Sequence, residues 1–580
     1  MSKYSRTLTS ADVARILIDS EDDFEDPDEP EDVFNCGDGP WNPSTNVDEV
    51  SDSSSESENN ELDEPEENDE FDEPEENNAH DPGDGDSDIP GPTVNNAVPA
   101  PVLPVTSLTI PNSVAVLPCQ PGPSGITGGP RKRSFTPRQN WSESHLLEGS
   151  RYDSPDPLSI LYLFLEPNFF EKIAKETNSY AEDFMADPNK VKRKFHEEWF
   201  PTTPDEMKGF LFLAVLFGLV KKPNLQSYWS HDKLTETPFF GQFMPYKRLI
   251  LLSKFFHLVS KEEQEQDESD KFKKFRWVYE LFNHKFATVY YPEQDIALDE
   301  SLMAFRGRLS YIQYNKAKRA RFGIKFYKLC ESKSGYCSKF KIYIGAEANA
   351  DKEYKVSEAI VFEMTERQVG LGHTLTLDNW YSSPNLYHSL ADKSFNALGT
   401  VNTNRVNMPC EFKFKNLERG DAEIKFSHNI AAIRWQDKKQ VCVLSTFHDG
   451  INKTETGKTN RKTGEKIVKP TAILDYNNTM GGVDRQVQVL ASYPIMRRYI
   501  YSKGYMKMFY YMLDMVIFNS FVIYKKLNPP LNPKKKKLHY TKFKEMLCKN
   551  IFETIQMPDY EMRGRPTSGI SPIRLQSNFQ

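Results

Sequence analysis

Three aspartates stand where a strand ends or a helix begins in the expected structure. Asp299 lies in the strand-like run Ile-Ala-Leu-Asp-Glu, and Asp378 closes the run Leu-Thr-Leu-Asp. Asp484 follows Met-Gly-Gly-Val at the expected start of a helix. Where the first and fourth strands of a sheet are neighbours, carboxylates on those strands and one on a later helix can converge on one patch.

Such a patch suits phosphodiester chemistry. Two divalent ions can activate the attacking oxygen and stabilise the leaving one, and Mg²⁺ prefers carboxylate oxygens while keeping several waters. The alternative is that each aspartate only forms a turn or caps a helix. For any one of them alone that alternative is the better interpretation, and only their shared position in the strand and helix order favours a metal site.

The surrounding pattern predicts the elements that carry these residues. Runs of apolar and β-branched residues separated by turns predict strands, and longer periodic runs predict helices. The predicted strands are 296–303, 309–314, 323–330, 339–344, 374–377 and 397–401, and the predicted helices between them are 357–369 and 384–392. Three antiparallel strands followed by alternating helices and strands match the order of an RNase H-like fold.

Helical segments flank this core. Thr203 and Glu206 form a capping box with Pro204 at the first helical position, which predicts a helix that ends near residue 222. Further helices are expected at 246–258, 271–290 and 505–525, and another begins at 483. Residues 402–469 interrupt the core with strand-like pieces and a loop rich in Lys, Thr and Gly, so they are interpreted as an insertion.

The N-terminal 150 residues differ in composition from the rest. Between Glu21 and Pro90 there are 30 Asp and Glu and no Lys or Arg, and Asp-Glu-Pro-Glu-Glu-Asn occurs twice. Such a segment cannot bury enough apolar surface to offset its ordering entropy, so it is expected to be disordered. Because the whole chain carries −10, the remainder is at about +20, which suits a polyanion such as DNA. A soluble protein with scattered surface lysines would show the same composition.

Several other classes are disfavoured. The seven cysteines are odd in number and form no Cys-x-x-Cys, so neither a disulfide framework nor a zinc site is expected. The N-terminus lacks the apolar stretch of a signal peptide. The longest apolar run, 210–220, is too short to cross a bilayer, so no membrane partner is expected.

The ordered motifs from about residue 155 to 575 resemble those of piggyBac transposases. The three aspartates lie in the motifs Asp-Glu-Ser-Leu-Met with Phe-Arg-Gly-Arg, Leu-Asp-Asn-Trp-Tyr-Ser-Ser and Met-Gly-Gly-Val-Asp. The similarity also includes Gly323-Ile-Lys325, Tyr343-Ile-Gly345, Trp435-Gln-Asp-Lys-Lys439 and Tyr476-Asn477. The chain is therefore identified as a member of that family.

The resemblance implies an α/β RNase H-like catalytic core, a mixed sheet flanked by helices. It also implies an insertion domain and a split all-α dimerisation and DNA-binding domain, behind the acidic N-terminus. The expected parts are a tail and linker (1–150), a first helical part (155–290), a first catalytic part (291–401), the insertion (402–469), a second catalytic part (470–487), a second helical part (488–550) and a C-terminal tail (551–580).

The implied activity is metal-dependent excision of a DNA element through hairpin ends, with integration at TTAA. Asp299, Asp378 and Asp484 become the catalytic and metal-binding residues, with Mg²⁺ or Mn²⁺ as cofactor. The implied partners are double-stranded DNA and a second copy in a homodimer, while the protein partners of the acidic tail are unknown. The residues expected to contact DNA are Lys325, Arg497, Arg498, Lys503 and Lys507.

Three features depart from the family pattern. Val487 stands where the family often has a further Asp, and Asn402 stands where an Arg is usual. The Cys/His-rich zinc module that follows in the family is missing after Leu575. These departures keep open a second hypothesis, a domesticated protein that binds DNA or chromatin without catalysing transposition.

The basic run Lys534–Lys537 beside Pro533 resembles a nuclear localisation signal. We therefore expect a nuclear protein, and replacing the four lysines with Ala should move a tagged chain toward the cytoplasm. Fluorescence microscopy of the tagged chain measures the distribution. An unchanged distribution would mean that the run is only a solvated surface segment or that a second signal suffices.

Overall fold

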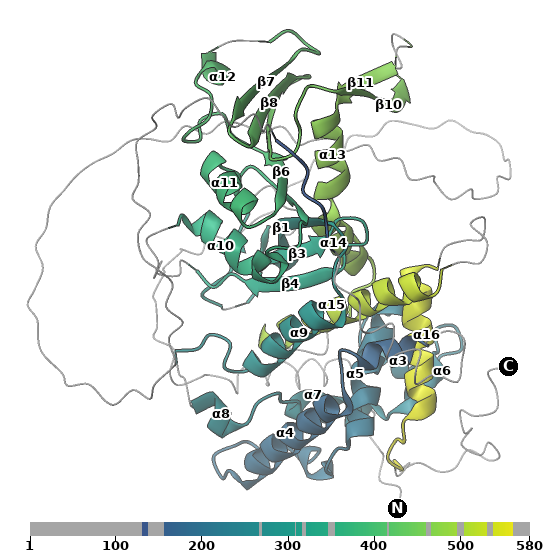
Figure 1. Ribbon diagram of the computed structural model, residues 1–580. Helices are drawn as coiled ribbons and strands as arrows, with labels where there is room; N and C mark the ends of the chain where they lie inside the picture. The colour runs from purple at the N-terminus through teal and green to yellow at the C-terminus, as the bar shows by residue number, and fades with distance from the viewer. Residues whose placement is uncertain are drawn as a thin grey trace, which may run out of the picture. The chain divides into compact units, whose positions relative to one another are not determined.

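The computed structural model describes most of the chain after residue 155 (Figure 1). The described residues are 130–136, 156–265, 269–307, 309–315, 321–345, 354–414, 417–459, 464, 466–495, 504–529 and 538–560. Several predictions fall outside this part of the chain, namely those on the acidic tail, Arg497, Arg498, Lys503, Lys534–Lys537 and the last twenty residues.

The described residues of the first helical part form seven α-helices and two short 3-10 helices. These are α3 (Pro157–Tyr162), α4 (Pro167–Ala186), η1 (His196–Glu198), α5 (Pro204–Leu219), η2 (Gln226–Trp229), α6 (Pro238–Phe243), α7 (Tyr246–Phe255), α8 (Lys261–Glu265) and α9 (Arg276–Val289). Four of them, α3 to α6, begin with proline, which has no N–H to lose at that position. The helix expected over 271–290 starts at Arg276, five residues later than predicted.

Helix α5 begins as predicted, but its capping box is only half formed. The Thr203 hydroxyl accepts a hydrogen bond from the Glu206 amide at 3.1 Å. The Glu206 carboxylate does not reach back, because Arg248 of α7 holds it through two bonds of 2.7 and 2.6 Å. Tyr560 donates to the same carboxylate at 2.9 Å. A buried carboxylate requires such partners, and here they join three distant segments.

The sheet contains nine strands, of which eight follow the order β2-β3-β1-β5-β6-β9-β8-β7, while β4 pairs with β3. Strand β1 pairs antiparallel with β3 and parallel with β5. The strands are β1 (Asp295–Ala304), β2 (Gln313–Tyr314), β3 (Phe322–Glu331), β4 (Cys337–Ile342), β5 (Thr374–Leu377), β6 (Asn396–Thr400), β7 (Ala422–Ser427), β8 (Ile430–Gln436) and β9 (Gln440–Ser445). The predicted adjacency of the Asp299 strand and the Asp378 strand is therefore confirmed.

Helices cover both faces of the sheet, consistent with an RNase H-like core (Figure 1). Leu375 and Leu377 of β5 share a core with α10 (Val356–Thr365), which runs into η3 (Glu366–Gln368), and α11 (Pro384–Asp392). Thr376, between those leucines, points to the other face and hydrogen-bonds Thr479 of α13 (Thr471–Met480) at 2.8 Å. Helix α14 (Gly482–Ser492) packs on β1 and β3.

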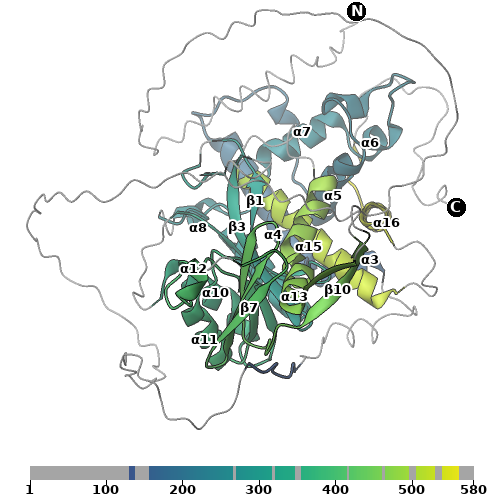
Figure 2. The same ribbon diagram turned by 90° about the horizontal axis from the view of Figure 1, so that it is seen from above.

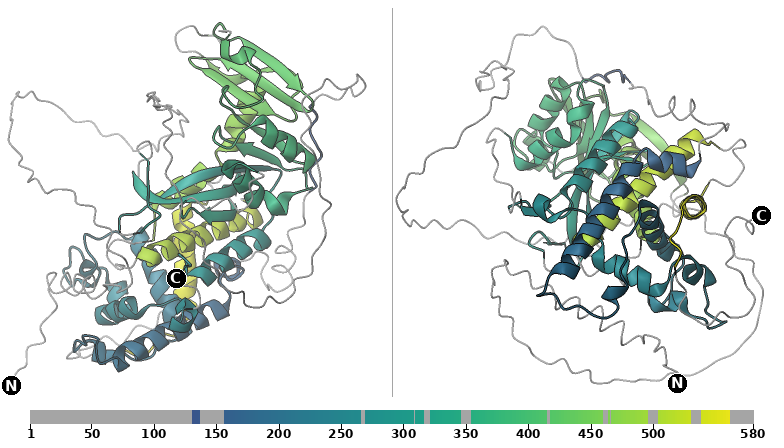
Figure 3. Two further views of the ribbon diagram at one scale, coloured as in Figure 1. Left: turned by 90° about the vertical axis from the view of Figure 1, so that its left-hand side faces the viewer. Right: turned by 90° about the horizontal axis from the view of Figure 1, so that it is seen from below.

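The strands of the expected insertion continue the core sheet. Strand β9 pairs with β6, with Leu398 opposite Ser445, so β7 to β9 extend the sheet rather than forming a separate one (Figure 3, left). The short helix α12 (Glu411–Phe414) precedes β7. A two-stranded ribbon, β10 (Lys453–Thr459) and β11 (Lys466–Pro470), then leads directly into α13.

The second helical part packs against the first. Helix α15 (Gly504–Leu527) contacts α3 and α9, and α16 (Tyr540–Thr554) contacts α3 and α5 (Figure 2). Helix α15 is long and apolar enough to cross a membrane by length and composition alone, but 94% of its most apolar stretch is buried in the fold. Its apolar character is explained by its position in the core.

A short segment ahead of the helices also packs on the core. Residues 130–136, within the region expected to be tail and linker, lie against the starts of β5 and β6. The wholly buried Asn396 side chain accepts a hydrogen bond from the Arg133 amide at 2.7 Å and donates to the Arg133 carbonyl at 3.2 Å. The Thr136 amide donates to Leu371 O at 2.9 Å. The side-chain amide of Asn396 thus bonds both the N–H and the carbonyl of Arg133, as the backbone of a neighbouring strand would.

The segment is held closely at its centre as well. Gly372 has a φ of +76°, and a Cβ there would lie 2.1 Å from the Ser134 carbonyl oxygen. Only glycine permits both this backbone conformation and this approach. The Phe135 ring meets His373 edge-on at 4.8 Å. Residues 130–136 therefore belong to the folded unit.

Replacing Arg133 with Pro should release this segment, because proline has no N–H to give to Asn396. The Thr136 amide, now bonded to Leu371 O, should then exchange hydrogen at least about tenfold faster. Hydrogen exchange read by mass spectrometry measures the change. Arg131→Pro is the matched control and should leave the exchange rate as in the parent. Equal protection in the Arg133→Pro variant would contradict the docking.

Candidate active site

Two of the predicted aspartates lie side by side where the parallel pairing of β1 and β5 stops. Leu298 of β1 and Leu377 of β5 are in register, and Asp299 and Asp378 are the next residue on each strand. In a parallel pair, residues in register project to the same face. Both aspartates are half-buried. Parallel pairing of β1 and β5 therefore brings the backbones of the two aspartates next to each other, between two interior strands of the sheet.

The face to which they project is the one covered by α13, α14 and α15. Asp299 is opposite Lys328 of β3, and the Lys328 side chain reaches Gln486 of α14 and Tyr511 of α15. On β5, Thr376 faces the same helices and meets α13. The end of α13 and the start of α14 thus lie over the two carboxylates.

Asp484 lies in the first turn of α14, on the same side of the sheet, with its side chain exposed. Gly482 brings this turn against the end of β3, since a Cβ there would be 3.0 Å from Glu331 O. Among the residues that the structure describes, no three His, Cys, Asp or Glu side chains lie close enough to hold a metal ion. The structure thus brings Asp299 and Asp378 together and places Asp484 on their side without completing a trio.

The pair occupies a region of crowded negative charge. Burial raises the pKa of Asp378, and the nearby Glu300 raises it further, while hydrogen bonds from the Trp380 and Tyr381 amides and the charge of Lys325 act against the rise. Burial also raises the pKa of the Tyr381 hydroxyl, as do the charges of Glu300, Asp299 and Asp378. Crowded, partly desolvated carboxylates are a typical environment for a bound cation.

Lys325, expected to contact DNA, is engaged with protein groups on the opposite face of β3 from Lys328. Its Nζ lies 2.5 Å from Glu300 Oε1 and within 4.7–5.6 Å of the ring centres of Tyr327, Trp380 and Tyr343. Its side chain keeps 21% of its surface exposed. The lysine therefore neutralises the glutamate that follows Asp299.

Lys507 is the other described residue among those expected to contact DNA. It lies on α15, with its ammonium 5.4 Å from the ring of Phe305, just after β1. The chain leading toward Arg497 and Arg498 is fixed by a buried ion pair, since Asp514 Oδ2 accepts from the Ile495 amide at 3.1 Å and Asp514 Oδ1 from Lys544 Nζ at 3.2 Å.

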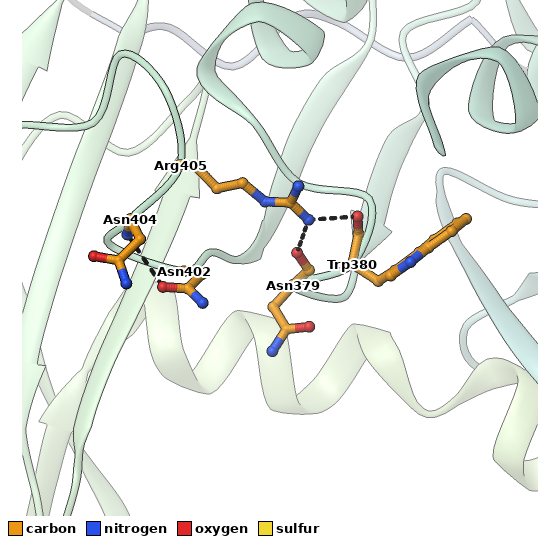
Figure 4. Close-up of a pocket in the computed structure, with 5 residues that line it drawn as sticks. All are labelled: Asn379, Trp380, Asn402, Asn404 and Arg405. Atoms are coloured by element: carbon orange, nitrogen blue, oxygen red, sulfur yellow. Dashed lines mark hydrogen bonds between the residues drawn. The ribbon is translucent and has the colours of Figure 1, made fainter. Parts of the chain in front are cut away.

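The two other departures from the family pattern have different surroundings. Val487 is partly buried and packs against the main hydrophobic core, so it adds no oxygen to the site. Asn402 lines a cavity of about 280 Å³ beside the site, together with Asn379, Trp380, Asn404 and Arg405 (Figure 4).

Arg405 is a residue that sequence reasoning missed. Its guanidinium donates to the Asn379 carbonyl at 3.0 Å and to the Trp380 carbonyl at 2.7 Å, the two residues that follow Asp378 (Figure 4). It therefore holds the turn that carries this carboxylate. Lys328 was also missed, because a lysine within an apolar strand gives no signal of its partners.

The fold and site define the class of protein, a mixed sheet flanked by helices with two neighbouring aspartates where two adjacent parallel strands stop pairing. The sequence profile of the Transposase IS4 family matches residues 156–521. Because this match covers more than half of the chain, the chain belongs to that family, in its piggyBac branch.

Individual relatives support the same assignment. The chain is 26% identical over 424 residues to PiggyBac transposable element-derived protein 3 of Homo sapiens, covering 71% of this chain and 67% of that protein. It is 23% identical over 396 residues to PiggyBac transposable element-derived protein 2 of Homo sapiens, covering 66% and 64%. The match thus spans about two thirds of each relative's length. The predicted membership is confirmed.

A solved structure shares the fold. The cryo-EM structure of a piggyBac transposase synaptic complex with hairpin DNA superposes with a TM-score of 0.59 at 24% identity, covering 69% of this chain and 80% of that one.

Asp378→Asn should stabilise the metal-free protein at neutral pH. The neutral amide avoids desolvation and repulsion by Glu300, while its oxygen can still accept from the Trp380 and Tyr381 amides. Because the folded-state pKa is raised, the gain is full above that pKa and disappears as the pH falls toward the ordinary Asp value. Thermal unfolding in a chelator should show a midpoint about 1–3 °C higher.

The exposed Asp392 at the end of α11 provides the matched control. Asp392→Asn should leave the midpoint unchanged at every pH. A lower midpoint for Asp378→Asn at neutral pH would show that the carboxylate is stabilised by its surroundings rather than strained by them.

Proposed function

We propose that this chain is a piggyBac-like transposase that cuts and rejoins DNA with Mg²⁺ or Mn²⁺ held by Asp299, Asp378 and Asp484. The observation that carries the proposal is the pair of aspartates that directly follow the register pair Leu298 and Leu377, where the parallel pairing of β1 and β5 stops. The order of the strands supports an RNase H-like core as the framework of the site.

The donor chemistry fits a hard divalent cation. Asp299 and Asp378 offer carboxylate oxygens, and the burial that raises the pKa of Asp378 favours neutralisation by a cation. When bound, divalent ions would activate the attacking oxygen and stabilise the leaving one. Asp484 would join from α14 by a small shift of an exposed first turn. Metal dependence also agrees with what membership of a transposase family implies.

The remaining residues would orient this set. Lys325 pairs with Glu300 and so reduces the negative charge next to Asp299 and Asp378. Arg405 fixes the turn after Asp378 by its two carbonyl contacts. Both residues act on the position and charge of the carboxylates.

Double-stranded DNA is the proposed substrate and partner. The piggyBac transposase structure that shares this fold is named as a synaptic complex with hairpin DNA. The body of this chain carries about +20 once the acidic N-terminal region is set aside. Lys507 and the basic residues Arg497, Arg498 and Lys503 would meet phosphates, with TTAA as the integration target and a homodimer as the working unit.

A second function, a domesticated DNA-binding protein without strand cleavage, is favoured by one specific observation. Val487 packs into the core where the family often has a further carboxylate, and the described residues do not complete a group of three ligands. The curated relatives are named as transposable element-derived proteins, which fits either function.

Cleavage of a TTAA-flanked DNA end against Mg²⁺ concentration separates the two functions. Replacing Asp299, Asp378 or Asp484 with Ala should lower the cleavage rate about a hundredfold or more. Each replacement removes carboxylate ligands of the proposed metal ions, and those ions would stabilise the transition state. DNA binding, measured in the same samples by fluorescence anisotropy, should remain largely intact. Val487→Asp should lower the Mg²⁺ concentration needed if its backbone faces the site.

Asp392→Ala, on the opposite face of the sheet, serves as the control and should cut like the parent. If all three Ala variants cut as well as the parent, the active-site assignment is wrong. If the parent never cuts but Val487→Asp does, the chain is a decayed transposase. If neither cuts with any metal while DNA binding persists, the domesticated function holds.

A further inference from the structure

Lys328 is a buried lysine whose two hydrogen-bond acceptors, Gln486 and Tyr511, are both neutral. None of its surface is exposed, and its Nζ donates to Gln486 Oε1 and to the Tyr511 hydroxyl, each at 2.8 Å. It also lies 4.9 Å from the centre of the Tyr511 ring. Removing an ammonium group from water is costly unless a negative charge lies nearby, and two neutral acceptors compensate only in part.

The negative charge nearest in the strand register is Asp299. Lys328 and Asp299 are directly opposite each other in the antiparallel pair of β3 and β1. Opposed residues project to the same face with Cβ atoms about 4.5–5.5 Å apart. Through Gln486, the same ammonium contacts α14 two residues after Asp484. Lys328 is therefore positioned between the strand and the helix that carry two of the proposed metal ligands.

We propose that Lys328 is a positioning residue whose fixed charge balances Asp299 before metal binds and raises the metal concentration that the site requires. The inference rests on the proposed function, because it concerns the same carboxylates. Lys328 lies outside the proposed catalytic trio. Its buried ammonium would repel the metal ion that binds to the trio.

The charges support this assignment. Glu300 is already paired with Lys325, so the aspartates of the proposed site would supply its negative charge. Lys328 reduces the net charge seen by a cation, and a divalent ion entering beside a buried ammonium is repelled through a medium of low dielectric. Burial between β1, α14 and α15 prevents the ammonium from turning away into solvent, so this repulsion is permanent.

Direct binding of Mn²⁺ to the full-length chain tests the proposal without using activity. Electron paramagnetic resonance of free Mn²⁺, recorded without DNA, gives the dissociation constant. Lys328→Met removes the charge but keeps an apolar stem of similar length, and it should bind Mn²⁺ about tenfold more tightly. Lys328→Gln, which retains hydrogen-bonding ability, should change in the same direction. Tyr511→Phe is the matched control, because it removes one hydrogen bond and keeps the charge, and its affinity should equal that of the parent.

Asp299→Asn distinguishes failure of the inference from failure of the proposed function. If Asp299→Asn binds Mn²⁺ like the parent, the metal site itself is misassigned. If Asp299→Asn loses binding while both folded Lys328 variants bind as weakly as the parent or more weakly, the role of Lys328 is overturned. Circular dichroism establishes folding, and if Lys328→Met does not fold, Lys328→Gln alone decides. Tighter binding in Tyr511→Phe would also overturn the proposal, since geometry rather than charge would then control affinity.

Discussion

Parallel pairing of β1 with β5 is the constraint on which the site depends. Parallel neighbours cannot be joined by a tight turn, so the chain must cross over between them. Here the crossover consists of β3, β4 and α10, which build one half of the sheet and cover one face. The same pairing brings Asp299 and Asp378 to one edge from positions 79 residues apart. The two aspartates would not lie beside each other if β5 were paired elsewhere.

The charges around this edge are balanced by residues on both faces of β3. Lys325 neutralises Glu300 among aromatic rings on one face, and Lys328 is buried on the other, between Asp299 and α14. Alternation along a strand thus assigns two lysines, three residues apart, to two different roles. Helix α14 depends on the same arrangement, because Gln486 connects it to Lys328 and Gly482 lets its first turn approach β3.

Much of this framework could be predicted from the sequence, because local signals were strong. The Thr203 cap, the strand around Asp299 and the short strand before Asp378 were placed within a few residues, and their adjacency followed from strand order. Long-range pairings could not be predicted in the same way. Nothing local indicates that β9 joins β6, that Glu206 turns from its cap toward Arg248, or that Asn396 binds the backbone of Arg133. Each depends on partners far along the chain, where neither periodicity nor turn chemistry gives information.

The difference between a working and a decayed site here is a question of charge. Val487 replaces an oxygen ligand with an aliphatic group that belongs to the core, so restoring an oxygen there would also cost apolar packing. Lys328 acts in the same direction, since it adds positive charge beside Asp299. With the proposed metal site, both features would weaken the attraction for divalent ions while leaving the fold and the carboxylate pair intact. A chain with these two features retains the architecture of a transposase, and any cleavage it performs would need more metal than a site with a further carboxylate and no buried ammonium.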